Sequence, residues 1–406
     1  MITLKNSRVQ AWIIVFLVWL GAFIASYAQN QLSGMSVQFM EHYGFTAEQY
    51  ASIYSASQFL GIWLAFVTGI LSDKIGTRKI IILAGLAVSI ACTWRIFATT
   101  FETQYIANML SGFTGLFIAV NRAKILGGWF PPSMIAIAVG IVSTTTPVAN
   151  TVGIGLTSLM PSVEFAFGVT AAIAIFFLVM WFLFGKERSE EIAAIEDEQP
   201  KGNLWKNLLE VLKSPWAWAI CVGAFFIMAC QVPIMAFYPM ALQMGGAGLD
   251  AVAAGGMVTG VTIGMGVGSV VTPFFVKLTK AYRPIIAIYA IIVAAGAYFG
   301  WQMAAGPLMY AVLFIVGFCL GGLLAMPWTF PIMIFGHEKA ASAQGLIQTF
   351  VLAGASLALT NITIPLAGAP TNFGNLYMIA AIYAIIAGVA LIIVPDQGKK
   401  AAGVEK

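Results

Sequence analysis

The chain has 406 residues, of which 60% are hydrophobic and only 9% are charged. A soluble globular domain of this composition would expose far too much apolar surface, and a transmembrane β-barrel would show short alternating segments in place of long apolar runs. The net charge of +4 gives no reason to propose nucleic acid as a partner.

The apolar runs predict an all-α membrane protein, because each approaches or exceeds the roughly 20 residues that cross the hydrocarbon core. Breaks at Ala304-Ala305-Gly306-Pro307 and Gly368-Ala369-Pro370-Thr371-Asn372 divide the two longest runs. We therefore predict twelve transmembrane helices near residues 11–34, 50–72, 80–99, 104–123, 134–158, 165–185, 216–242, 251–275, 284–303, 307–333, 342–365 and 375–394. We interpret the first run as a retained helix because it is longer than the apolar core of a signal peptide.

Basic residues fix the sidedness of the predicted helices. All but Arg95 fall on one side of the expected bundle: Lys5, Arg8, Lys74, Arg78, Lys79, Arg122, Lys124, Lys186, Arg188, Lys201, Lys206, Lys213, Lys277, Lys280, Arg283, Lys339, Lys399, Lys400 and Lys406. The opposite loops carry Glu41, Glu48, Glu102, Glu164 and Asp250 and no Lys or Arg. The positive-inside rule makes the basic side cytoplasmic, so we expect both termini in the cytoplasm and the protein in the cell membrane.

The most specific motif lies between the second and third predicted helices. Residues 69–79 read Gly-Ile-Leu-Ser-Asp-Lys-Ile-Gly-Thr-Arg-Lys, in which Gly69 and Gly76 allow tight turning and close helix approach. The pattern resembles the loop between helices 2 and 3 of the major facilitator superfamily. That resemblance implies twelve helices in two six-helix halves, with alternating access to a substrate bound between them. It also implies a gating role for this loop, in which Asp73 and Arg78 help to close the cytoplasmic side against the helix that begins near Ser342.

Two arginines fall inside predicted spans. Arg122 lies about seven residues before Trp129, roughly 10 Å inside the cytoplasmic boundary. An arginine there should face water, a partner or an anion, since its guanidinium fork matches a carboxylate; snorkelling to the surface is the alternative. Arg95 lies in the outer half of the third helix, where it could contact substrate, snorkel outward or pair with a neighbouring backbone.

The sequence Trp129-Phe130-Pro131 at the turn after the fourth helix resembles the organic-anion, organophosphate and nitrate branches of the superfamily. Those branches usually continue with a basic residue, whereas Pro132, Ser133 and Met134 follow here. The resemblance implies an anionic substrate.

The longest polar stretch, residues 186–214, predicts a cytoplasmic linker between an N-terminal half (residues 1–185) and a C-terminal half (residues 215–406). Residues 204–212, Leu-Trp-Lys-Asn-Leu-Leu-Glu-Val-Leu, are typical of a short amphipathic interfacial helix, although a plain linker is the alternative.

Glycines recur at every fourth position of the eighth predicted helix, at Gly256, Gly260, Gly264 and Gly268. They share one helix face, which predicts close packing against a neighbouring helix and is compatible with a sliding surface. The cysteines Cys92, Cys221, Cys230 and Cys319 all fall inside predicted helices, which favours packing over disulfides or metal binding.

Uncharged polar and aromatic residues complete the candidate substrate contacts. Those in helices expected to line the cavity are Tyr27, Gln29, Asn30, Gln31, Gln58, Asn150, Gln231, Tyr238, Trp328 and Asn361. Each could instead bond to a neighbouring helix. Proline residues in the seventh and tenth helices, Pro233, Pro239, Pro327 and Pro331, could bend those helices where a gate is needed.

No Asp or Glu lies inside a predicted span, and both histidines, His42 and His337, fall in loops. Membrane enzymes usually need acidic or histidine clusters, so we expect no catalytic residue, no metal and no cofactor. We predict a transporter, expected to be monomeric in lipid, for a small organic anion such as a carboxylate. The alternatives are an exporter of neutral or amphipathic aromatic compounds and a membrane sensor that binds ligand without flux.

Overall fold

The computed structural model describes residues 2–130, 132–186, 204–245 and 247–395, without the side chains of some helical positions. Every secondary-structure element in these ranges is helical. The elements are α1 (Ile2–Gly34), α2 (Ser36–Tyr43), α3 (Ala47–Ile75), α4 (Thr77–Phe97), α5 (Phe101–Ser111), α6 (Phe113–Gly127), α7 (Pro132–Ser143), α8 (Thr145–Thr157), α9 (Val163–Phe184), α11 (Leu204–Leu212), α12 (Pro215–Met244), α13 (Ala251–Thr279), α14 (Arg283–Phe299), the 3-10 helix η1 (Gly300–Gln302), α15 (Pro307–Ala358), the π-helical turn η2 (Leu359–Thr363), α16 (Ile364–Ala367) and α17 (Phe373–Ile393).

Ten of the described helical segments are long and apolar enough to cross a membrane. The other two predicted spans correspond to α3, which covers 50–72, and to α5 with α6, which together cover 104–123. Gly112 separates α5 from α6 at a close approach to α3, where an added Cβ would lie 2.0 Å from the Ser57 carbonyl oxygen. The sequence therefore placed the membrane-crossing segments correctly, but three boundaries differ from the prediction. The fourth predicted span is divided into α5 and α6, and the fifth is divided into α7 and α8 at Thr144. The tenth and eleventh predicted spans lie within the single element α15, so no helix begins near Ser342.

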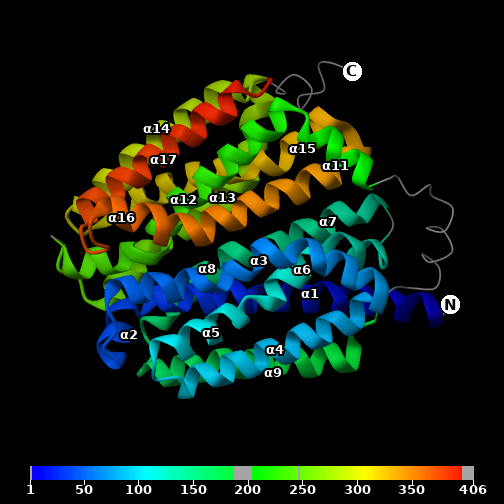
Figure 1. Cartoon of the computed structure of the whole chain (residues 1–406), viewed down its shortest axis with the longest axis horizontal. Helices are drawn as coiled ribbons and strands as arrows, with labels where there is room; N and C mark the ends of the chain where they lie inside the picture. Colours follow the sequence, from blue (N-terminus) through cyan, green and yellow to red (C-terminus); the bar gives the residue numbers. More distant parts are fainter. Residues whose placement is uncertain (1, 131, 187–203, 246, 396–406) are drawn as a thin grey trace.

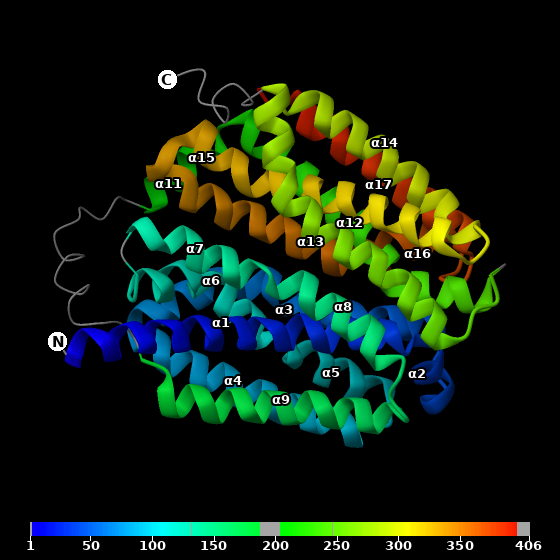
Figure 2. The same ribbon diagram turned by 180° about the vertical axis from the view of Figure 1, so that it is seen from behind.

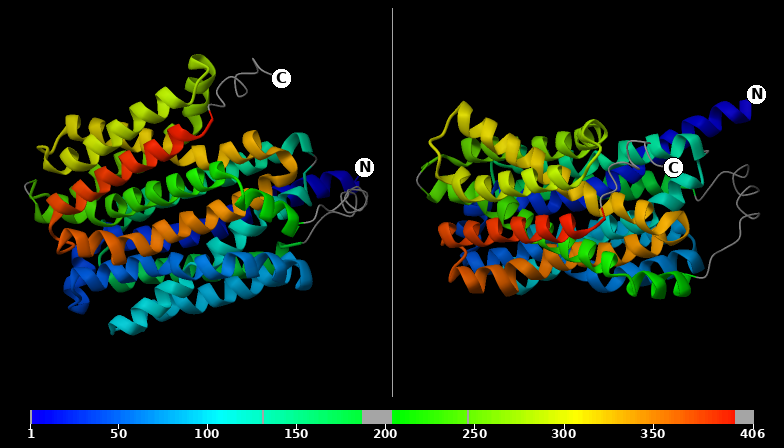
Figure 3. Two further views of the ribbon diagram at one scale, coloured as in Figure 1. Left: turned by 45° about the horizontal axis from the view of Figure 1, so that its top comes forward. Right: turned by 90° about the horizontal axis from the view of Figure 1, so that it is seen from above.

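The helices form two groups. Helices α1 to α9 pack on one another, as do α12 to α17, and Figures 1 and 2 show the groups as two layers of nearly parallel helices. Figure 3 shows the same alignment of helix axes from two further directions. We call the end of the bundle that holds the start of α1 and the turn at Gly76 the terminal face. The opposite end, which holds the turns at Gly44 and Gly368, is the distal face.

The glycine spacing of α13 produces the closest helix packing in the C-terminal half. An added Cβ would lie 2.2 Å from the Phe314 carbonyl oxygen at Gly264 and 1.9 Å from the Phe318 carbonyl oxygen at Gly268. Glycines on α15 allow the same close approach from the other side, because an added Cβ at Gly317 would lie 2.0 Å from the Val261 carbonyl oxygen. The two backbones touch directly, which confirms the close packing that the spacing predicts.

The predicted interfacial helix at residues 204–212 is present as α11. Glu210 forms an ion pair with Lys339 of α15, and Val211 is fully buried in a small apolar cluster with Ala217 and Ala343. The end of the linker is therefore fastened to the C-terminal half. The rest of the predicted linker, residues 187–203, lies outside the described ranges.

The two groups contact each other mainly where α1 meets α12, α3 meets α15 and α8 meets α13, with smaller contacts of α2 with α12 and of α3 with η2. By contrast α7, which continues α8 toward the terminal face, packs against α1, α6 and α8 of its own group. The Tyr50 hydroxyl donates to the Ala236 carbonyl at 2.9 Å, and the Thr151 and Thr262 hydroxyls lie 2.7 Å apart. The halves are thus joined from mid-depth to the distal face.

A proline explains one of the contacts that join the two halves near the distal face, which we call the distal closure. The Ser33 hydroxyl of α1 donates to the Met235 carbonyl of α12. In a regular helix that carbonyl would accept from the backbone N–H four residues later, but residue 239 is a proline and has none. Pro239 therefore leaves an acceptor on α12 that a side chain of the other half occupies.

Candidate functional site

Five polar side chains from three helices form one hydrogen-bonded network inside the N-terminal half. Gln58 Nε2 donates to Gln29 Oε1 at 3.0 Å, and Tyr54 Oη donates to Asn30 Oδ1 at 3.2 Å. Asn30 Nδ2 donates to Asn150 Oδ1 at 2.8 Å, and Gln29 Nε2 donates to the Tyr54 carbonyl at 3.3 Å. We call Gln29, Asn30, Tyr54, Gln58 and Asn150 the amide network.

Local sequence explains how three helices contribute to it. Gln29 and Asn30 are adjacent, so they point about 100° apart around α1, one toward α3 and the other toward α8. Gly153 lets α8 approach α1 closely, since an added Cβ there would lie 3.1 Å from the Asn30 Cβ. That approach brings Asn150, one turn earlier on α8, within reach of Asn30.

The network borders the interface between the halves. Gln58 is its half-buried member, whereas the other four are buried. Gly61, three residues after Gln58 and on the same side of α3, packs against Leu352 of α15. Asn30 lies three residues before Ser33 on α1, so the network sits one helical turn, about 5 Å, below the distal closure.

Gln231 brings an amide from the C-terminal half to the same level. It lies four residues before Met235 on α12, and its Oε1 is buried without a hydrogen-bond partner. The candidate site therefore consists of the amide network on one side and Gln231 on the other, at mid-depth between the halves. Such a site offers neutral donors and acceptors that can bind hydroxyl, carbonyl or carboxylate oxygens.

We expect Asn150→Ala to lower the free energy of unfolding by about 1 kcal/mol, because it removes the acceptor that Asn30 uses inside the membrane. Thermal unfolding of the purified protein in detergent measures the effect. Asn361→Ala is the matched control, since among the described residues the exposed Asn361 amide bonds to Leu357 at the end of α15 and to the adjacent Thr360. Equal melting temperatures for the two variants would contradict the prediction.

The structure places Arg122 away from the amide network. On α6, Ile118 packs against Gly21 of α1 and Gly115 against Ala25, which puts Arg122 near the level of Val18. It is therefore about 18 Å along α1 from Asn30, toward the terminal face. Arg122 is half-buried, and among the described residues it forms no hydrogen bond or ion pair.

Arg95 and Tyr27 lie inside the N-terminal half and do not reach the interface. Arg95 is fully buried and donates from Nη2 to the Ala28 carbonyl of α1 at 3.3 Å. Of the three alternatives that the sequence leaves for Arg95, the structure therefore shows a hydrogen bond to the backbone of a neighbouring helix. Tyr27 is buried beneath Phe23 in a stacked aromatic column along α1, with ring centroids 5.3 Å apart.

The remaining predicted contacts of the C-terminal half are dispersed. The Tyr238 hydroxyl donates to the Gly296 carbonyl of α14 at 2.8 Å, so it serves packing within that half. Trp328 is half-buried, and its carbonyl accepts from Gln344 at 3.4 Å. Asn361 is exposed in the π-helical turn η2. These residues do not converge with Gln231 on one site.

The predicted gating loop is only partly described. Gly76 joins α3 to α4 with φ of 89°, a conformation that favours glycine. Arg78 donates to the Phe182 carbonyl at 3.0 Å, and Trp181 Nε1 donates to the Arg78 carbonyl at 3.3 Å, so the loop is tied to α9. Gly69 lies within α3, and the side chain of Asp73 lies outside the described part of the structure.

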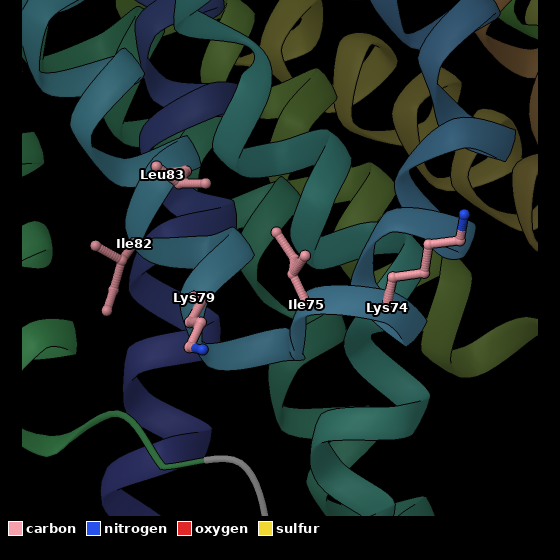
Figure 4. Close-up of a pocket in the computed structure, with 5 residues that line it drawn as sticks. All are labelled: Lys74, Ile75, Lys79, Ile82 and Leu83. Atoms are coloured by element: carbon pink, nitrogen blue, oxygen red, sulfur yellow. The ribbon is translucent and has the colours of Figure 1, made fainter.

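A surface hollow of about 560 Å³ adjoins this loop on the terminal face. Figure 4 shows Lys74 and Ile75 at the end of α3 and Lys79, Ile82 and Leu83 at the start of α4 around it. An adjoining hollow includes Arg78 and Lys186. The hollow is distant from the amide network and is lined by exposed cations at the expected membrane boundary.

Tyr54 is the network member that sequence reasoning did not select. Its spacing of four residues before Gln58 places both on one face of α3, which is the signal that could have identified it. The pairing of Asn30 with Asn150, 120 residues apart, has no such local signal.

Three comparisons with known proteins agree with this architecture. A family model described as Major Facilitator Superfamily matches residues 18–359. The chain is 23% identical over 183 residues to a hexuronate transporter of Bacillus subtilis (strain 168), a match that covers 44% of this chain and 43% of that relative. Less than half the length of that relative is therefore matched.

The fold is similar to two groups of solved transporter structures. A bacterial homologue of the human lysosomal transporter Spinster, in an inward-facing and unoccupied conformation, superposes with a TM-score of 0.74 at 12% identity, covering 95% of this chain and 97% of the other. A mutant of the nucleoside transporter NupG gives a TM-score of 0.71 at 12% identity, covering 94% of this chain and 100% of the other. At these identities the likeness shows the fold alone.

Proposed function

The chain belongs to the Major Facilitator Superfamily, and on that premise we propose that it transports a small organic anion, a carboxylate, across the cell membrane by alternating access. The main support for an anionic substrate is the charge of the predicted spans, which contain basic residues but no Asp or Glu. Lipid disfavours an isolated guanidinium, so the half-buried Arg122, which has no partner among the described residues, favours a negatively charged ligand.

The separation of Arg122 from the amide network supports two successive steps. Arg122, nearer the terminal face, attracts the anion by charge, and its fork binds the carboxylate. The amide network and Gln231 then hold the substrate at mid-depth through neutral hydrogen bonds. The B. subtilis relative, a hexuronate transporter, agrees with an anionic substrate.

The structure fits an inward-facing state under this proposal. The basic loops make the terminal face cytoplasmic, and the contacts between the halves run from mid-depth to the distal face. Transport would then be uniport, exchange, or symport with a proton carried on the substrate, because the predicted spans hold no carboxylate to relay protons.

Uptake into proteoliposomes tests the substrate class. Purified protein is reconstituted and challenged with radiolabelled glucuronate, competed by a panel of unlabelled monocarboxylates, dicarboxylates and their uncharged amides. Saturable uptake inhibited by carboxylates and not by the amides is the expected result. Binding of carboxylates in a thermal-shift assay without any flux would favour the sensor alternative.

The alternating-access part of the proposal is tested by locking the distal face. An added Cβ at Gly255 of α13 would lie 3.1 Å from the Ser158 Cβ at the end of α8, close to disulfide geometry. We expect Ser158→Cys with Gly255→Cys to lose at least about 90% of uptake on oxidation, because the halves can no longer part there, and to regain it with dithiothreitol.

The control for this experiment is Ser158→Cys alone, since the native cysteines are all buried. Mass spectrometry verifies that the cross-link has formed. Full uptake by the cross-linked protein would contradict a transport cycle that opens the distal face.

Export of neutral or amphipathic aromatic compounds is the second candidate. The observation in its favour is the amide network itself, which is uncharged and mostly buried at mid-depth. Competition of uptake by uncharged aromatic compounds and not by carboxylates would select this function.

A further inference from the structure

Arg95 is a buried cation with incomplete bonding inside the N-terminal half. Its side chain on α4 has no exposed surface, and its guanidinium carbon lies 4.1 Å from the centroid of the Phe167 ring on α9. Nη2 donates to the Ala28 carbonyl, whereas Nε and Nη1 are buried and have no partner in hydrogen-bond geometry. The buried Cys92 thiol, one turn earlier on α4, interacts with the guanidinium. The N–H groups of a charged fork that remain unpaired in a dry interior are costly, so they indicate a missing acceptor.

Other unpaired donors surround this guanidinium. The hydroxyls of Tyr27 on α1 and Tyr43 on α2 interact electrostatically with Arg95, and both are buried without a hydrogen-bond partner. The Thr157 and Gln31 side chains lie beside the Tyr27 hydroxyl, and the Gln104 side chain lies beside the Tyr43 hydroxyl, without reaching hydrogen-bond geometry. The group gathers hydroxyls from several helices near the guanidinium, and no carboxylate of the described residues is among the groups that act on Arg95.

No described carboxylate balances the charge. Glu164 interacts electrostatically with the Tyr43 hydroxyl. Its carboxylate, however, pairs with His42 at 2.7 Å, and both of these side chains are about 40% exposed. Burial raises the pKa of the Tyr43 hydroxyl, and the Glu164 charge raises it further. The phenol therefore stays neutral and can donate a hydrogen bond to an anion.

We propose that the N-terminal half binds one chloride ion among Arg95 Nε and Nη1 and the hydroxyls of Tyr27 and Tyr43. A monovalent anion matches the single guanidinium charge, and the guanidinium N–H groups and the two tyrosine hydroxyls can donate to it. A monatomic ion suits a side chain with no exposed surface, because a carboxylate substrate or a phosphate headgroup would need an opening. The chloride is structural and lies within one half, apart from the amide network.

Chloride dependence follows because an ion that binds the folded state alone stabilises it by mass action. The wild-type protein in detergent should melt at a higher temperature as chloride replaces methanesulfonate at constant ionic strength. Methanesulfonate serves as the bulky reference anion because it is not a carboxylate and so does not mimic the proposed substrate. Bromide should replace chloride and give an anomalous diffraction peak beside Arg95.

Arg95→Gln removes the charge and should abolish the chloride-dependent shift, whereas Arg122→Gln, which leaves this group intact, should retain it in full. Should Arg95→Gln fold poorly, Tyr27→Phe provides a milder variant with a smaller shift, and the bromide peak requires no variant. The proposal is overturned by a melting temperature independent of chloride, or by bromide-soaked crystals in which water alone occupies the space beside Arg95. Neither result would bear on carboxylate uptake, which tests the transport proposal separately.

Discussion

Replacing Gly268 by valine is expected to prevent the protein from reaching a stable folded state. The Cβ alone would lie 1.9 Å from the Phe318 carbonyl oxygen, and that oxygen belongs to the backbone of α15 and cannot rotate away. Separating α13 from α15 would also break the contacts at Gly264 and Gly317. We expect the free energy of unfolding to fall by at least about 2 kcal/mol, the range typical of overpacked cores.

Size-exclusion profiles and melting temperatures in detergent measure this loss. Gly256→Val is the matched control, because Gly256 belongs to the same four-residue series on α13 but is exposed and has no atom within 4 Å of an added Cβ. Loss of folded protein in the control as severe as in Gly268→Val would show that glycine is needed along α13 for a reason other than contact with α15.

Arg122→Gln is expected to lower the initial rate of carboxylate uptake at low substrate concentration by about ten- to a hundredfold. Hydrogen bonds from a charged group contribute about 1.5–3 kcal/mol, and each 1.4 kcal/mol corresponds to a factor of about ten. Arg122→Lys should fall between the variant and wild type, since lysine keeps the charge but lacks the planar fork.

Lys124→Gln is the control for position and charge. Lys124 lies two residues further along α6, so it points to a different side of the helix, and its side chain is exposed. Uptake by Lys124→Gln should match wild type. Wild-type uptake of carboxylates by Arg122→Gln would remove the basis for an anionic substrate and leave the export of neutral compounds as the better candidate.

Features that depend on the local sequence were predicted well. The breaks before Pro307 and at residues 368–372 separate η1 from α15 and α16 from α17, and the interfacial helix spans Leu204–Leu212 as expected. Apolar run length, proline and glycine positions, and helical periodicity determine these features, and all of them are visible in a single segment. The close packing of α13 follows from the same kind of signal.

Features that depend on the relative rotation and depth of helices were not predictable. Asn30 and Gln58 both join the amide network, but Tyr238, chosen on the same grounds, turns toward α14. Hydropathy cannot show which neighbour a polar side chain in a span will face. Nor did it show that Arg122 lies about three helical turns away from the amides, because that separation is set by the packing of Gly115 and Ile118 on α1.

When the distal side opens, the hydrogen bond between Ser33 and the Met235 carbonyl breaks, and the carbonyl needs water as a new partner. Because residue 239 is proline, that carbonyl has no N–H of its own helix to return to when α1 moves away. A bare carbonyl in a dry gap is unfavourable, so water must reach it as the halves part. Entry of solvent at this level is therefore part of the opening step itself.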